Sequence, residues 1–199
     1  MNDKAAYHHG NLRKALLEEA VTTIEAQGVE ALSMRQLAAS LGVSHAAPRR
    51  HFESKGDLLS AIVTDAYTEL TEAVFAHADD PALSRLERLN AMSRTAIDWA
   101  LANRAKFQVM TNPDVSRFAD EALKAALADF SAVLAKAITE ARSDGFHDDA
   151  PMEALFPFLI GSTVGIAKLL TDPLMAGALN IAKEPQTGDL ADLIVSPEE

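Results

Sequence analysis

The side chains best suited to bind an anion are concentrated between Met34 and Lys55. This segment holds four basic residues, one acid and two histidines, although the whole chain has 18 basic and 29 acidic residues and a net charge of −11. The first 60 residues are electrically balanced, so the remaining 139 carry the entire negative charge. A local basic patch can still bind a phosphate backbone, because screening limits exposed charges to a range of roughly 10 Å. The alternative is a solvated surface with no partner.

Residue patterns typical of enzymes and metal sites do not occur in this sequence. The chain has no cysteine, which excludes thiol nucleophiles, zinc ribbons and disulfides. It also lacks a glycine-rich phosphate loop, an H-E-x-x-H motif and a G-x-S-x-G motif. His8 and His9 have no third ligand at metal spacing nearby, and we expect them to form an arm near the nucleic-acid partner. The sequence therefore predicts no catalytic residue, no metal and no cofactor.

Helices are predicted on both sides of the basic segment. Apolar residues recur at every fourth position in the first predicted helix, which ends at Gly28: Leu12, Leu16, Ala20 and Ile24. A long helix is predicted to begin at Ser54, because the sequence from Ser54 to Asp57 resembles a helix cap.

A helix-turn-helix motif is predicted between these two helices. Ser33 and Gln36 match a capping box, so a helix is expected to begin there and to end at Gly42. Gly42 can adopt the left-handed conformation that a tight turn requires. Ser44 is expected to cap a second short helix that reaches about His51. In such a motif the start of the second helix enters the major groove, which makes double-stranded DNA the expected partner.

The rest of the chain is predicted to be helical too. Beyond His77, Asp-Pro, Asn-Pro, Asp-Gly and Ala-Pro pairs separate segments rich in alanine and leucine, with hardly any strand-like alternation. Pro157 is expected to kink the helix over 150–170 or to delay its start. The sequence thus predicts an all-α protein, with a compact amino-terminal unit followed by a larger helical bundle.

A cytoplasmic location without a membrane is expected from the distribution of apolar residues. The longest uncharged stretch, 154–167, is shorter than the ~20 apolar residues that a bilayer requires. The amino terminus has no apolar signal segment.

The motifs resemble the signature of the TetR family of bacterial transcriptional regulators. The resemblance is carried by GVEALSMRQLAASLGVSHAAP at 28–48 and by RHFESKGDLL at 50–59, and the leader YHHGNLR at 7–13 is similar to a subgroup. It implies a three-helix helix-turn-helix domain that binds DNA at 7–67, whose motif lies at about 33–52, followed by an effector and dimerisation domain at 68–199, and no enzymatic activity.

The resemblance implies eight DNA-binding residues: Arg35, Ser44, His45, Ala46, Arg49, Arg50, His51 and Lys55. The residues at 44–46 occupy positions that reach base edges. Arg35 resembles a phosphate or base contact, and His51 and Lys55 resemble clamps on the DNA backbone. Arg49 departs from the family, which usually has a phosphate-binding tyrosine there. Phe52 is expected in the core.

The resemblance also implies a small, mostly apolar ligand and a homodimer. The ligand is expected to lie against four side chains, whose alternative role is core packing: Trp99, Phe107, Met110 and Phe118. The dimer interface is expected to include four residues, whose alternative is packing within the subunit: Phe156, Leu159, Gly161 and Gly165. Residues 96–101 and 107–110 are similar to the subgroup with a WHG-type effector domain. That subgroup is expected to have a Trp, a His and a Gly near the last long helix, and this chain has only the glycine.

The sequence thus favours a repressor that binds a palindromic operator as a homodimer and is released by a small molecule. Two alternatives stay open. One alternative is a constitutive DNA-binding regulator without a ligand, and the other is a helical adaptor that binds other proteins. A salt-sensitive gel shift with DNA is expected of either regulator but not of the adaptor.

Overall fold

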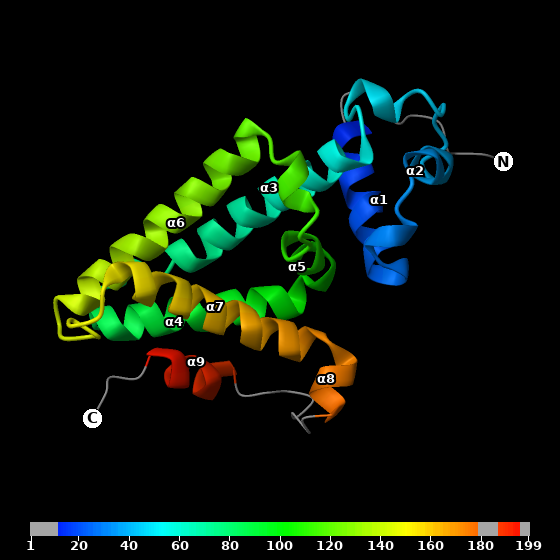
Figure 1. The fold of residues 1–199 in the computed structure, drawn as a ribbon. Coiled ribbons are helices and arrows are strands. Elements are labelled where there is room, and N and C mark those ends of the chain that lie inside the picture. Colours follow the sequence, from blue (N-terminus) through cyan, green and yellow to red (C-terminus); the bar gives the residue numbers. More distant parts are fainter. Residues whose placement is uncertain (1–11, 179–186, 196–199) are drawn as a thin grey trace. The chain divides into compact units, whose positions relative to one another are not determined.

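The computed structural model describes residues 12–178 and 187–195, and every regular element among them is helical, as the sequence predicts (Figure 1). With η denoting a 3₁₀ helix, the elements are α1 (Leu12–Gln27), η2 (Val29–Ala31), α2 (Met34–Ser40), η3 (Pro48–Arg50), α3 (Lys55–Phe75), α4 (Arg85–Ala102), α5 (Arg104–Met110), η4 (Val115–Phe118), α6 (Glu121–Arg142), α7 (Met152–Thr171), α8 (Pro173–Ala178) and α9 (Thr187–Val195).

The described residues divide into two compact units. The first unit comprises 12–66 and 105–125, and the second comprises 67–104, 126–178 and 187–195. The predicted helix-turn-helix segment lies in the first unit. Segment 105–125, which follows the predicted domain boundary, belongs to the first unit as well.

Helix α1 supplies a large part of the core of the first unit. All four residues of its predicted apolar stripe are buried, and the helix contacts η2, α2 and η3. It ends where predicted, because Gly28 adopts φ = +81°, a conformation that L side chains rarely occupy. The predicted motif therefore packs against a helix whose buried face can be read directly from the sequence.

Helix α2 is the first helix of the predicted motif, and the predicted turn follows it. Gly42 adopts φ = +67°, and its N–H donates to the Ala39 carbonyl at 3.1 Å. The Val43 N–H donates to the carbonyl of the buried Ala38 at 2.9 Å, which closes the turn. The capping box predicted at Ser33 is not formed, since the Ser33 hydroxyl accepts no bond from the first turn of α2. This end of α2 is partly exposed, so water can satisfy its N–H groups.

The second helix predicted from Ser44 is replaced by turns and by η3. The Ala47 N–H donates to the Ser44 carbonyl at 2.9 Å, and the Arg50 N–H donates to the Ala47 carbonyl at 3.2 Å. Both bonds span three residues. Pro48 has no N–H and cannot donate to Ser44 across the four residues that an α-helix requires. The Pro48 ring is buried and anchors the segment, whereas most side chains of 44–51 are exposed.

The capping pattern at the start of α3 is formed as predicted. The Asp57 N–H donates to the Ser54 hydroxyl at 3.2 Å, and the Ser54 N–H donates to the Asp57 carboxylate at 2.9 Å. This reciprocal pair satisfies two N–H groups at the start of the helix and places Lys55 in its first turn.

The second unit is a helical bundle in which α4 packs against α7 and α9, and α7 also contacts α8 and α9 (Figure 1). Its core contains aliphatic side chains from these helices, from the end of α3 and from α6: Leu70, Val74, Leu89, Met92, Ile97, Ile138, Leu155, Leu159, Leu170 and Ile194. Helix α7 begins at Met152 and continues through Pro157, so the predicted delay of its start is wrong.

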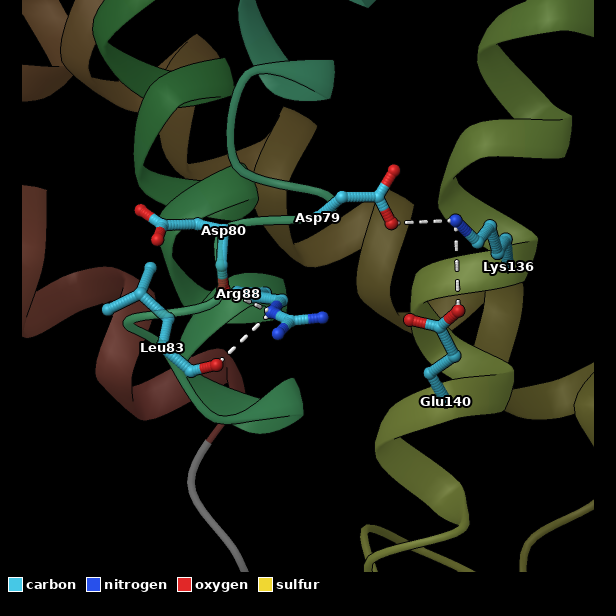
Figure 2. Close-up of polar contacts among 6 residues, drawn as sticks. All are labelled: Asp79, Asp80, Leu83, Arg88, Lys136 and Glu140. Atoms are coloured by element: carbon cyan, nitrogen blue, oxygen red, sulfur yellow. Dashed lines mark hydrogen bonds and ion pairs between the residues drawn. The ribbon is translucent and has the colours of Figure 1, made fainter.

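Charged groups hold the loop before α4 against α6 (Figure 2). Lys136 Nζ lies 2.9 Å from the Asp79 carboxylate and 3.8 Å from the Glu140 carboxylate. Arg88 Nε donates to the Asp80 carbonyl at 2.8 Å. The hydrogen bond from Lys136 and its charge lower the pKa of the Asp79 carboxyl, and Asp79 raises the pKa of Lys136 in return. These exposed contacts position the loop, and each contributes little stability because water screens them.

Candidate nucleic-acid interface

The predicted DNA-binding residues lie mainly on two neighbouring elements of the first unit. Arg35 is in the first turn of α2, Arg49 and Arg50 are on η3, and α2 contacts η3. The side chains of these arginines are exposed. Four further residues of the predicted set occupy the turns before and after η3 and are exposed as well: Ser44, His45, Ala46 and His51.

In the described part of the chain, no carboxylate neutralises the charge of these three arginines. Within 12–178 and 187–195, none of Arg35, Arg49 and Arg50 forms an ion pair, whereas cations elsewhere, such as Arg85 and Lys124, lie within 2.8 Å of a carboxylate. A guanidinium presents several N–H donors in a planar fork that matches phosphate oxygens. The surface formed by α2 and η3 is therefore suited to bind an anionic polymer.

Lys55 differs from the other predicted DNA-binding residues because its ammonium group has a partner inside the unit. Lys55 Nζ donates to the Val29 carbonyl at 2.7 Å, and the side chain is half-buried. This bond ties the first turn of α3 to η2. An ammonium group has three N–H donors, so two remain for another acceptor.

A cation that sequence analysis did not select lies beside this surface. The guanidinium carbon of Arg13, on α1, lies 5.4 Å from the centroid of the Phe52 ring. Phe52 is buried, as predicted, and it directly follows His51 in the chain. Nothing in the sequence links Arg13 to Phe52, because the contact depends on how α1 packs against the segment after η3. The expected arm at His8 and His9 lies outside the described residues.

The four predicted ligand-lining residues are divided between the two units. Trp99 is half-buried on α4 of the second unit. Phe107 is buried and Met110 half-buried on α5 of the first unit. Phe118, also in the first unit, is 43% exposed and its ring lies against Gly56. Three of the four side chains therefore belong to the unit that carries the DNA-binding segment.

The predicted interface residues on α7 point in different directions. Leu159 is 2% exposed and belongs to the core of its own unit, and Phe156 is half-buried. Gly161 and Gly165 are exposed, with open space where a Cβ would lie. Apart from the charged Glu153 and Lys168 near its ends, the exposed residues of α7 form one stripe of mostly small and apolar side chains, which we call the α7 face: Ala154, Pro157, Phe158, Gly161, Val164 and Gly165.

By length and composition alone, α7 could also cross a membrane. The uncharged stretch 154–167 is shorter than the helix, because the 20 residues of α7 also include Glu153 and Lys168 near its ends. The length of that stretch therefore underestimates the length of the apolar helix. Its buried residues belong to the core of the second unit. The core helix of a soluble protein meets the same criterion, so one such helix is weak evidence for a membrane span.

Comparison with known proteins agrees with the geometry of the first unit. Residues 16–62 match the family model described as bacterial regulatory proteins, tetR family. Two curated relatives are the HTH-type transcriptional regulators Rv1816 of Mycobacterium tuberculosis and Mb1846 of Mycobacterium bovis, each 32% identical over 84 residues. That stretch covers 42% of this chain and only 36% of either relative.

Solved structures extend the likeness in fold to nearly the whole chain. A protein of unknown function from Rhodococcus sp. RHA1 has a TM-score of 0.74 at 27% identity, covering 95% of this chain and 94% of its own. The TetR-family regulator PfmR from Thermus thermophilus has a TM-score of 0.70 at 21% identity, with coverages of 92% and 98%. AibR, solved with isovaleryl coenzyme A and operator DNA, has a TM-score of 0.72 at 21% identity, with coverages of 94% and 99%.

The matched helix-turn-helix segment, the arginines that form no ion pair among the described residues and the all-helical fold therefore agree with one another. Residues 16–62 match the tetR family of bacterial regulatory proteins, and the chain is similar in fold to solved TetR-family regulators.

Proposed function

We propose that the protein is a cytoplasmic repressor that binds a palindromic operator as a homodimer and leaves it when a small, mostly apolar ligand binds. The observation that carries this proposal is the set of exposed arginines on α2 and η3 that form no ion pair among the described residues, in a chain whose net charge is −11. Three exposed guanidinium groups on two neighbouring elements of an acidic protein give it a local positive charge that attracts a phosphate backbone.

Within this surface we assign different tasks to different residues. Arg49 and Arg50 bind phosphates, since guanidinium groups on a short, anchored element fix the register of the protein on the duplex. Ser44, His45 and Ala46 read base edges, the first two by hydrogen bonds and the alanine methyl by contact with a thymine methyl. The turn at Gly42 and the buried ring of Pro48 hold these residues on either side.

A palindromic site requires a second subunit, and we assign the interface between the two subunits to the α7 face. One helix-turn-helix motif reads about half a site, and half-sites one turn apart, ~34 Å, demand two-fold symmetry. Phe158 is 56% exposed and Val164 is 36% exposed on this face, and neighbouring apolar side chains that are open to water are typical of a protein–protein interface. Gly161 and Gly165 leave room for another backbone to approach closely.

Two solved proteins of similar fold support a small-molecule effector. AibR binds isovaleryl coenzyme A together with operator DNA, and FadR from Bacillus halodurans is described as a fatty acid degradation regulator. Acyl compounds are therefore the first effectors to test, because their hydrocarbon chain is the apolar part that the proposed ligand requires. A constitutive regulator is the outcome if no effector changes operator affinity.

The experiment that tests the proposal is selection of bound duplexes from random-sequence DNA by the full chain, followed by affinity measurements at roughly 50–200 mM salt. We expect enrichment of a palindrome and affinities that fall steeply with salt. Absence of any enriched sequence, together with salt-independent or undetectable binding, would replace this proposal with the helical adaptor.

A further inference from the structure

Arg13 is held next to the DNA-binding segment by an aromatic ring. Its guanidinium carbon lies 5.4 Å from the centroid of Phe52, within the ~6 Å over which a cation is attracted to a ring face. Phe52 follows His51 directly, and α1 contacts η3. Packing thus brings a charge from α1 to the end of a segment that already carries Arg49 and Arg50.

The guanidinium of Arg13 is available to an external anion. The residue is exposed, and within the described part of the chain it forms no ion pair. The guanidinium has five N–H donors, and no hydrogen bond of Arg13 is seen within the described part of the chain. The contact with the ring therefore restricts the position of the charge and leaves N–H donors for a phosphate.

The adjacent cation has a different environment. Lys14 Nζ lies 3.6 Å from the Glu18 carboxylate one turn further along α1, so its charge is partly neutralised on its own helix. Arg13 and Lys14 thus have the same formal charge in the same helical turn, and only Arg13 is placed beside Phe52. This pair provides a matched control inside the chain.

We infer that Arg13 is an additional operator contact, binding a DNA phosphate alongside Arg49 and Arg50, with Phe52 as the residue that positions it. The inference rests on the proposed function, since it requires that the protein bind a duplex. A phosphate contact contributes affinity without sequence preference and adds about −0.9 to the slope of log affinity against log salt. In a two-fold symmetric complex Arg13 contributes twice.

The test compares Arg13→Gln and Lys14→Gln with the unaltered chain, on a duplex selected from random-sequence DNA and on its scrambled version. We expect Arg13→Gln to weaken binding to both duplexes by the same factor and to reduce the salt slope by nearly two units. Lys14→Gln should leave the slope close to that of the unaltered chain. Arg13→Lys should keep the slope and lose part of the affinity, because lysine keeps the charge without the planar group. Thermal melting of each variant verifies that the fold is retained.

Two results would overturn the inference. One is a slope for Arg13→Gln equal to that of the unaltered chain, and the other is equal loss of slope in Arg13→Gln and Lys14→Gln, which would indicate a general charge effect. Failure of the unaltered chain to bind any duplex is a different result, because it rejects the proposed function itself.

Discussion

Phe118 lies so close to Gly56 that no side chain can occupy position 56 without displacing the ring. A Cβ built on Gly56 would stand 2.2 Å from Cδ1 and 2.5 Å from Cγ of Phe118. Both residues belong to the first unit, and Gly56 lies in the first turn of α3. Segment η4 is therefore seated on the helix that follows the DNA-binding residues, through a contact that requires glycine.

Gly56→Ala should destabilise the protein by about 1–3 kcal/mol, because the new methyl group forces the Phe118 ring out of place. Glycine-to-alanine changes inside helices normally stabilise by about 0.5–1 kcal/mol, so the expected sign is reversed. Urea unfolding measures the effect. Gly177→Ala is the control, since nothing lies within 4 Å of a Cβ there. The double variant with Phe118→Ala should recover stability relative to Gly56→Ala alone, and a fully stable Gly56→Ala would refute the close contact.

Phe158→Asp should convert the proposed dimer into a monomer at micromolar concentration and leave the subunit folded. The side chain is exposed on the α7 face, so a charge there is costly only when a second copy covers it. Leu159→Ala should act differently, lowering the free energy of unfolding by about 2–5 kcal/mol, because this residue is buried in its own unit. Sedimentation velocity and chemical unfolding separate the two effects. A monomeric unaltered chain would reject the interface.

Arg49→Tyr should preserve sequence preference and reduce the salt slope of operator binding by nearly two units per dimer, because a neutral hydroxyl replaces a charged phosphate contact. Arg49→Ala should weaken binding to operator and scrambled DNA by the same factor. Arg94→Ala removes an arginine from the exposed surface of α4 in the second unit and is the control. A loss confined to one guanine-containing position would show that Arg49 reads a base.

Asp79→Asn should make stability less dependent on pH in acid. The pKa of Asp79 is lowered in the folded protein, chiefly by its hydrogen bond with Lys136, so its contribution is present above the unfolded value of about 3.9 and disappears as pH falls through the folded value. The pKa of Lys136 is raised, so the same pair also loses its contribution as pH rises through the folded value of the lysine. Melting temperatures across pH for Asp79→Asn, Lys136→Met and the double variant measure the coupling. Additive effects of the two substitutions would show that the pair does not interact.

Ser60→Ala should leave the free energy of unfolding unchanged or raise it by about 1 kcal/mol, because removing a buried polar group that has no partner removes a desolvation cost. Ser60 is fully buried on α3, and within the described part of the chain its hydroxyl has no hydrogen-bond partner. The matched change at the nearby Thr64, Thr64→Val, removes a hydroxyl that donates to the Ser60 carbonyl at 2.9 Å and should be destabilising by comparison. Strong destabilisation by Ser60→Ala would reveal a partner for the hydroxyl.

The local elements of the DNA-binding unit follow from the sequence alone. The apolar stripe of α1, its end at Gly28, the left-handed Gly42 and the reciprocal cap of Ser54 and Asp57 all agree with expectation. Each of these features depends on residues within about one helical turn of one another, so residue type and spacing determine them. The failure of the predicted second helix is local too, because it follows from the missing N–H of Pro48.

Contacts between distant residues were decided by the tertiary structure. The bond from Lys55 to the Val29 carbonyl spans 26 residues, and the contacts of Arg13 with Phe52 and of Phe118 with Gly56 join separate elements. On α7 the sequence shows an apolar helix, but which of the adjacent Phe158 and Leu159 turns outward depends on how that helix packs on α4. Periodicity describes one helix at a time, whereas the partner of each face is set by the packing of elements far apart in the chain.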